Sequence, residues 1–228
     1  MIQIHKVKIL LLAAILAGLL STDLSAHEVV GEVTPLMIHM KRVLLLIENG
    51  KEKESIREIR AVYEDFSHDM GMGMSMQGTG LKNTADQIDL RFGTRLKVSL
   101  EEALKKEDAP ALQKAIQEIA FLLMLEKFEA LRSTFDKKTA NQEAQETIFW
   151  LGRNYFSYLL EPALASKNPV EEQRLDRLLD RMLYRLEDGK FDEFAALQKE
   201  LVTGVQTAFH LDLPSMTPAR DGSGQFVR

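Results

Sequence analysis

The sequence has 228 residues, a formal net charge of −5 and no cysteine. An acidic chain has no general attraction for a phosphate backbone, which disfavours nucleic acid as a partner. The absence of cysteine excludes disulfides, thiolate catalysis, thiolate zinc sites and covalent c-type haem attachment. The core must therefore be built from ordinary hydrophobic side chains.

The first 26 residues have the layout of a secretory signal peptide. A basic start, MIQIHKVK, precedes an apolar run from Ile9 to Leu20 and a polar end, STDLSA. The apolar run is too short to cross a bilayer core of about 30 Å as a helix. We therefore expect cleavage after Ala26, a mature protein without a membrane span, and a periplasmic or secreted location.

Apolar residues recur at three- and four-residue spacing from Thr34 onwards, which predicts an all-α fold. The first helix is expected to begin at Pro35, behind the capping residue Thr34, and to end at Asn49-Gly50. Gly50 allows a tight turn into a second helix over residues 51–68, so that the two form a hairpin. A third helix is expected from about residue 84 to residue 104.

The same spacing predicts four further helices. The fourth follows a cap at Asp108, and the fifth follows a cap at Thr139 and is kinked or ended by Pro162. The sixth starts at Asn168 and turns at Asp188-Gly189 into the seventh. The sequence thus predicts an antiparallel bundle of about seven helices arranged in hairpins.

The bundle is expected to form one domain over residues 27–213, because a chain of this length suffices for a single core. The remaining residues, 214–228, are rich in Gly, Ser, Pro and charge. This composition predicts a disordered C-terminal tail.

Two of the expected hairpins have similar sequences. RVLLLIENGKEKE, residues 42–54, and RMLYRLEDGKFDE, residues 181–193, share Arg, Leu, Glu, Gly, Lys and Glu at corresponding positions. Each is expected to lead into a helix that ends near a histidine, His68 or His210. An internal duplication would explain the similarity, and so would the general use of a Gly-Lys turn after a Glu-rich helix. Both interpretations stay open.

The most unusual segment is SHDMGMGMSMQGTG, which follows the second expected helix. Methionine alternates here with glycine or serine, at Met70, Met72, Met74 and Met76. Thioether sulfur is a soft ligand for Cu(I) and needs no deprotonation, so it stays usable in an oxidising compartment. His68 is expected on the opposite side of its helix from Phe66, where it faces either solvent or the following loop, and in the second case it adds an imidazole donor.

In its M-x-M-x-M spacing and its histidine, this segment resembles the methionine-rich, histidine-containing loops of periplasmic copper-handling proteins. The resemblance is confined to the segment and implies copper binding by His68 and the methionines, without implying a fold. The alternative is that the methionines form a flexible apolar lid or an adaptable partner surface, because methionine fills irregular gaps.

A haem site is a third interpretation. Met37 or Met40 on the first helix and His210 at the end of the last helix make a conceivable axial pair, as in helical bundles that resemble b-type cytochromes. His39 lies between the two methionines, near the edge of the apolar stripe. A helix-terminal histidine that interacts with the last carbonyls explains His210 without haem.

The sequence contains no Glu-x-x-His pair, G-x-S-x-G elbow, H-E-x-x-H motif or phosphate-binding loop, so we expect no enzyme. The leading hypothesis is an exported helical bundle that binds a soft metal ion, copper, for sequestration or delivery. Its expected ligands are His68, Met70, Met72, Met74 and Met76. The competing hypothesis is a non-catalytic adaptor whose methionine-rich loop contacts a membrane or secreted partner.

Overall fold

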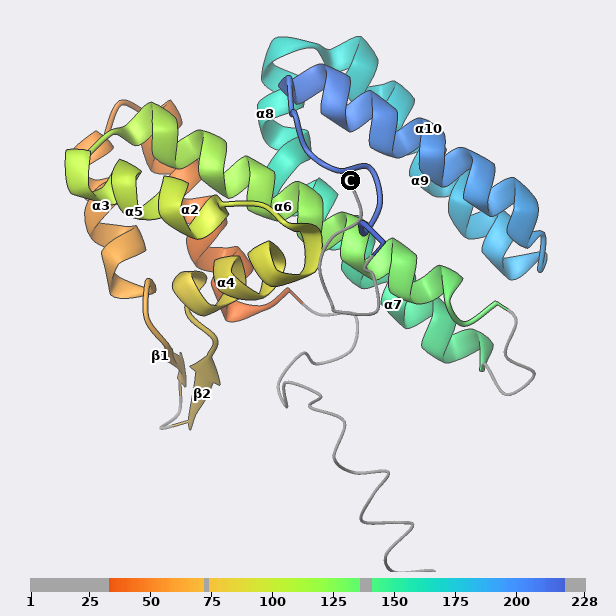
Figure 1. The fold of residues 1–228 in the computed structure, drawn as a ribbon, viewed down its shortest axis with the longest axis horizontal. Helices are drawn as coiled ribbons and strands as arrows, with labels where there is room; N and C mark the ends of the chain where they lie inside the picture. Colours follow the sequence, from red (N-terminus) through yellow and green to blue (C-terminus); the bar gives the residue numbers. More distant parts are fainter. Residues whose placement is uncertain (1–32, 72–73, 136–140, 220–228) are drawn as a thin grey trace, which may run out of the picture.

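The computed structural model describes residues 33–71, 74–135 and 141–219, without the side chains of Asp69, Met70 and Met74. Within these ranges the chain is a bundle of α-helices with one two-stranded sheet, which confirms the predicted all-α class (Figure 1). The expected signal peptide lies outside the described residues. The elements are α2 Pro35–Glu48, α3 Glu52–Ala61, β1 Phe66–Gly71, β2 Met74–Gly78, α4 Leu81–Phe92, α5 Leu96–Lys106, α6 Ala109–Arg132, α7 Gln142–Tyr155, the π-helical segment η1 Phe156–Leu160, α8 Glu161–Lys167, α9 Pro169–Glu187 and α10 Phe191–Phe209.

Helix α6 is the centre of the bundle (Figure 1). It has 24 residues and packs against α2, α3, α4, α5, α7 and α10, so it is apolar on almost every side. Asp108 caps it as predicted, because its Oδ1 accepts a hydrogen bond of 3.0 Å from the amide of Ala111. In the described part of the chain no helix, α6 included, is long and apolar enough to cross a membrane.

The two hairpins of similar sequence, α2–α3 and α9–α10, have the same turn. Gly50 and Gly189 adopt left-handed φ values of 70° and 67°. In each hairpin the amide of the next lysine donates to a carbonyl five residues earlier, at 2.8 Å in both. A glycine in this conformation ends many helices, so the shared turn does not require a duplication. The hairpins differ beyond the turn, since α3 has 10 residues and α10 has 19.

The third helix expected from the sequence is two helices, α4 and α5. Gly93 ends α4 with a left-handed φ of 71°. Asp89 then caps the start of α5, because its carboxylate accepts from the amides of Leu96 at 2.7 Å and Lys97 at 3.0 Å and from the hydroxyl of Thr94 at 2.6 Å. The chain changes direction here while its apolar side chains stay in the core.

The fifth helix also differs from its prediction in detail. Asn141 is the observed cap of α7 and accepts from the amide of Glu143 at 3.0 Å, whereas Thr139 lies outside the described residues. The interruption expected at Pro162 is present: α7 gives way to η1, and Pro162 sits in the first turn of α8. The chain stays helical from η1 into α8, and the amide of Glu161 donates to the carbonyl of Phe156 five residues earlier, so a wider π turn lies just before the proline that lacks a donor.

After α10 the chain returns over α6 (Figure 1). The side-chain amide of Gln206 donates to the carbonyl of Leu213 at 2.6 Å. Thr217 then donates from its backbone amide to Glu129 Oε1 at 2.6 Å, and its hydroxyl contacts the other oxygen of the same carboxylate. Residues 214–219 of the expected tail thus have a defined path, and residues 220–228 lie outside the described ranges.

Candidate functional site

A β-hairpin stands where the sequence predicts the end of a helix and a loop. The prediction of a helix over residues 51–68 is wrong after Ala61, where α3 ends. Strands β1 and β2 follow and pair in antiparallel fashion, and the hairpin projects from the helices between α3 and α4 (Figure 1). His68 is therefore a strand residue, and helical geometry does not decide which way it faces.

The base of the hairpin is fixed to the start of α4. Two backbone hydrogen bonds of 2.9 Å join the residues after α3 to the first residues of α4. Asp65 Oδ1 accepts from the amide of Gly80 at 2.8 Å and from the side chain of Asn83 at 2.9 Å, and these two donors lower the pKa of Asp65. Gly80 leaves no room for a side chain, because a Cβ there would lie 2.2 Å from the carbonyl carbon of Glu64.

The strand register brings two of the predicted site residues together. His68 lies directly opposite Met76, and Phe66 lies directly opposite Gly78. Directly opposed residues project from the same face of a ladder, and so do residues two apart along a strand. The ring of Phe66 covers Gly78, since a Cβ on that glycine would lie 2.5 Å from Phe66 Cζ. One face of the hairpin therefore carries Phe66, His68 and Met76.

This face is turned towards α2, where His39 meets it. The ring centroid of His39 is 5.2 Å from that of Phe66 and 5.4 Å from that of His68, and both pairs meet edge to face. The expectation that His68 faces away from Phe66 is thus wrong, because a strand places residues two apart on the same side. His39, His68 and Met76 form the candidate site, and all three side chains are half-buried.

The five predicted ligands are described to different extents in the structure. His68 and Met76 are described completely and lie opposite each other. The backbones of Met70 and Met74 belong to β1 and β2, but their side chains lie outside the description, and Met72 lies outside the described residues altogether. His39 is the residue that the sequence did not assign to this site. Its position at the edge of an apolar stripe gave no sign of which partner it would meet.

The candidate site offers neutral donors. An imidazole without an added proton and a thioether carry no charge, and both suit soft or borderline metal ions. Among the described residues no group of three or more His, Asp and Glu side chains is placed to hold a metal ion. A hard cation that requires several carboxylate oxygens therefore finds no ready site in these ranges.

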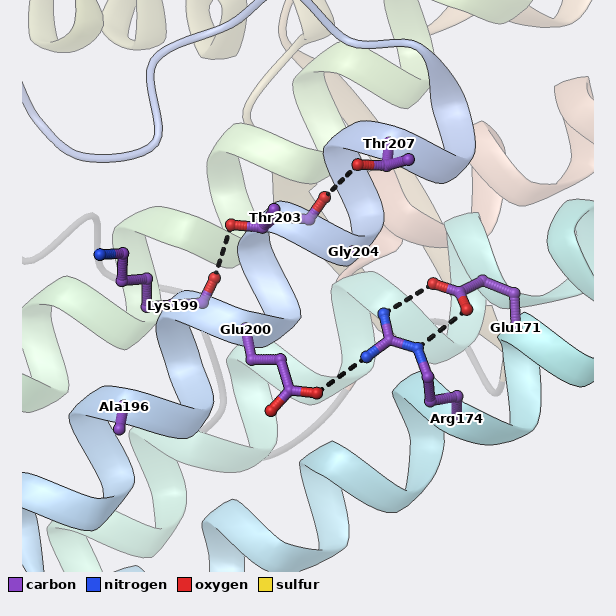
Figure 2. A pocket seen from close by; sticks show the side chains of 8 residues that line it. All are labelled: Glu171, Arg174, Ala196, Lys199, Glu200, Thr203, Gly204 and Thr207. Atoms are coloured by element: carbon purple, nitrogen blue, oxygen red, sulfur yellow. Dashed lines mark hydrogen bonds and ion pairs between the residues drawn. The ribbon is translucent and has the colours of Figure 1, made fainter.

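A shallow hollow of about 410 Å³ lies between α9 and α10, and three of its charged side chains, Glu171, Arg174 and Glu200, pair with one another (Figure 2). The guanidinium of Arg174 lies between two carboxylates, 2.7 Å from Glu171 and 2.9 Å from Glu200. The hydroxyls of Thr203 and Thr207 donate to backbone carbonyls of their own helix at 2.9 and 2.8 Å. These contacts give the polar side chains of Glu171, Arg174, Glu200, Thr203 and Thr207 a structural role within the helix pair.

A second cavity, of about 280 Å³, bears on the haem interpretation. Met37 and Met40 are buried and line it, together with Tyr155 and residues from β2, α4 and α6. His210 is not among its lining residues; it is exposed and ends α10 in a left-handed conformation with φ 52°. The cavity therefore does not bring the suggested methionine and histidine together.

No family model, curated protein or solved structure matches this chain. Of the arrangements described above, the face shared by His39, His68 and Met76 is the one that gathers neutral nitrogen and sulfur donors suited to soft or borderline metal ions.

Proposed function

We propose that this protein is an exported, non-enzymatic metal-binding protein that holds Cu(I) on its β-hairpin, for sequestration or delivery. The observation that carries the proposal is the cross-strand pair of His68 and Met76. The pair puts an imidazole and a thioether side by side on one strand ladder, at the separation of directly opposed strand residues.

The chemistry of these donors favours Cu(I) over other common ions. Thioether sulfur binds soft ions and remains a ligand in an oxidising compartment, whereas carboxylate and carbonyl oxygens select Mg²⁺ and Ca²⁺. Structural zinc sites use four ligands drawn from Cys, His, Asp and Glu. The chain has no cysteine, and the described residues offer no such group of His, Asp and Glu.

The sequence supplies further soft donors in the same hairpin. Met70, Met72 and Met74 follow His68 at two-residue spacing. We propose that they increase the affinity of the site or the number of ions that it holds. This part of the proposal rests on composition and on the resemblance to methionine-rich copper-handling loops, because those side chains lie outside the description.

The test is a competition titration of the mature protein with Cu(I), and with Ag(I) as an air-stable substitute, against a chromophoric chelator. One variant carries leucine at all four hairpin methionines, and a second carries His68→Gln. The matched control is Met216→Leu, which removes an exposed thioether outside the hairpin. We expect both site variants to lose affinity and the control to bind like the wild type.

Two outcomes would overturn the proposal: a wild-type protein that binds neither ion, or unchanged binding after all four hairpin methionines are replaced. A protein partner that binds the hairpin equally well with and without metal would instead support the adaptor hypothesis. A Soret absorption band in the purified protein would support the haem hypothesis.

A further inference from the structure

We infer that His39 of α2 is a third ligand of the same ion, and that Glu58 of α3 positions the His39 ring for this role. The inference rests on the proposed metal site and extends it from the hairpin to the helical bundle. It identifies two residues that the methionine-rich sequence does not point to. Three observations carry it: the distance between the two histidine rings, the hydrogen bond to Glu58, and the burial of both partners.

The distance between the rings fits one shared ion. With a nitrogen–metal distance of about 2 Å, two imidazoles on one metal have ring centroids roughly 5 to 6 Å apart. The centroids of His39 and His68 are 5.4 Å apart. The rings now meet edge to face, and Glu58 and Phe66 hold the His39 ring, so ligation requires the His68 ring to turn. Met76, opposite His68, supplies the thioether.

The hydrogen bond to Glu58 fixes which nitrogen of His39 is the donor to a metal. Nδ1 of His39 lies 2.7 Å from Glu58 Oε1. An ionised carboxylate can only accept a hydrogen bond, so Nδ1 carries the proton and the lone pair of neutral His39 is on Nε2. Metal-binding histidines commonly have such a carboxylate on the other ring nitrogen, because it holds the tautomer and the ring orientation.

The surroundings of this pair keep it in place. The side chains of His39 and Glu58 are only 19% and 15% exposed, so few waters compete for the hydrogen bond. Arg42 lies on the other side of the carboxylate, with its Nε 3.4 Å from Glu58 Oε2. The ring of Phe66 packs against His39 and limits its rotation. A carboxylate one hydrogen bond away from the ligand also offsets the charge of a monovalent ion among neutral donors.

Binding of one ion by all three donors would join the projecting hairpin to α2. The hairpin is otherwise held mainly at its base, through Asp65 and the backbone bonds to α4. The ion would therefore act as a cross-link at the level of His68. The expected consequence is slower hydrogen exchange of the β1 and β2 amides in the metal-bound protein.

The role of Glu58 is tested on the metal-free protein. Nitrogen-15 NMR of the histidine rings reports which ring nitrogen carries the proton, and we expect the Nδ1–H form for His39. Glu58→Leu keeps the bulk but removes the acceptor, so the two tautomers should mix and the two ring nitrogen shifts should approach each other. The control is Glu54→Leu, an exposed position one turn earlier on α3. An Nε2–H form in the wild type, or no change in Glu58→Leu, overturns the positioning role.

The ligand role is tested by the same Cu(I) and Ag(I) competition titrations. His39→Phe keeps a ring against Phe66 and should lower the affinity at least tenfold, and Glu58→Leu should lower it by about ten- to hundredfold. His210→Phe, at an exposed histidine outside the hairpin, is the control. Thermal unfolding of each variant shows whether a lost affinity reflects lost folding.

These results separate the two proposals. Wild-type binding that is weakened by His68→Gln but unchanged by His39→Phe in a folded protein overturns the ligand role of His39 and leaves the hairpin site intact. A wild type that binds neither ion overturns both the proposed function and the ligand role. In that case the NMR result still decides whether Glu58 holds the His39 tautomer.

Discussion

Phe66 lies across Gly78 on the face of the β-hairpin that meets α2, and its ring occupies the space that a side chain at position 78 would need. The two residues are directly paired in the ladder, so the contact sits two residue pairs closer to the hairpin base than His68 and Met76. Phe66 also touches the His39 ring. Glycine at position 78 thus allows the aromatic ring to close the gap between the hairpin and α2.

Gly78→Ala should therefore weaken the hairpin and its contact with α2. The added Cβ would lie 2.5 Å from Phe66 Cζ, so the ring must move, and overpacking of this kind costs about 1 to 3 kcal/mol. We expect faster hydrogen exchange of the β1 and β2 amides and a weaker Cu(I) affinity. Ser75→Ala, at an exposed position on β2, is the control. Exchange rates equal to those of the wild type would show that the ring relocates without loss.

Asp89→Ala should destabilise the whole bundle through the start of α5. The carboxylate of Asp89 accepts from two amides of the first turn of α5, and loss of a cap of this kind costs about 0.5 to 2 kcal/mol. Chemical denaturation should show a lower free energy of unfolding with an unchanged slope. Glu102→Ala, which removes an exposed partner of Lys106 on α5, should cost only a few tenths of a kcal/mol. Equal losses in the two variants would contradict the capping role.

Glu118→Gln should stabilise the protein at neutral pH. Burial raises the pKa of Glu118, and the nearby Lys114, 3.8 Å away, only partly opposes this effect. A carboxyl whose pKa is higher in the folded than in the unfolded protein favours folding while protonated. That contribution is lost as the pH rises from the unfolded pKa of about 4.3 through the folded value.

The free energy of unfolding of Glu118→Gln should thus exceed that of the wild type at neutral pH and approach it in mildly acidic solution, where Glu118 is protonated. Denaturant titrations over this pH range measure the difference. Glu102→Gln, at an exposed carboxyl, should show no such trend. A difference between Glu118→Gln and the wild type that is independent of pH would mean that ionisation of Glu118 is not the cause.

The helical part of this fold could be predicted where the signal is local. Thr34 and Asp108 cap their helices as expected, and α9 starts where expected, with Asn168 as its cap, because a capping side chain bonds to an amide only a few residues away. The sequence pattern does not predict the break between α4 and α5. Ile88, Phe92, Leu96 and Leu100 are all buried and keep a four-residue spacing across it, so the apolar pattern continues where the helix does not.

The candidate site could be predicted only in part. The methionine-rich segment stands out by composition. Its two-residue alternation is also the period of a strand, but its glycines favour the interpretation as a loop. The contact between His39 and His68 has no local signal. It depends on the register of the hairpin, where Phe66 pairs with Gly78, and on the orientation of the hairpin against α2, where Phe66 meets His39.

Thr217 ties the C-terminal segment to α6 and α4, so Thr217→Val should release it. The amide and the hydroxyl of Thr217 both bond to the carboxylate of Glu129. On α4, Arg91 Nε lies 3.5 Å from the hydroxyl oxygen of Thr217, and Arg91 Nη1 binds Glu126 on α6 at 2.6 Å. Valine keeps the shape but removes the hydroxyl, and a hydrogen bond to a charged group contributes about 1.5 to 3 kcal/mol.

Limited proteolysis should cut Thr217→Val faster than the wild type after α10, with little change in the midpoint of global thermal unfolding, because few core residues depend on this segment. Thr203→Val is the control, since its hydroxyl bonds within α10. Glu129→Gln should have the same effect as Thr217→Val in a weaker form, because an amide oxygen still accepts but without the charge. If Thr217→Val were cut no faster than Thr203→Val, the segment would be held by its apolar contacts instead, such as that of the buried Leu211.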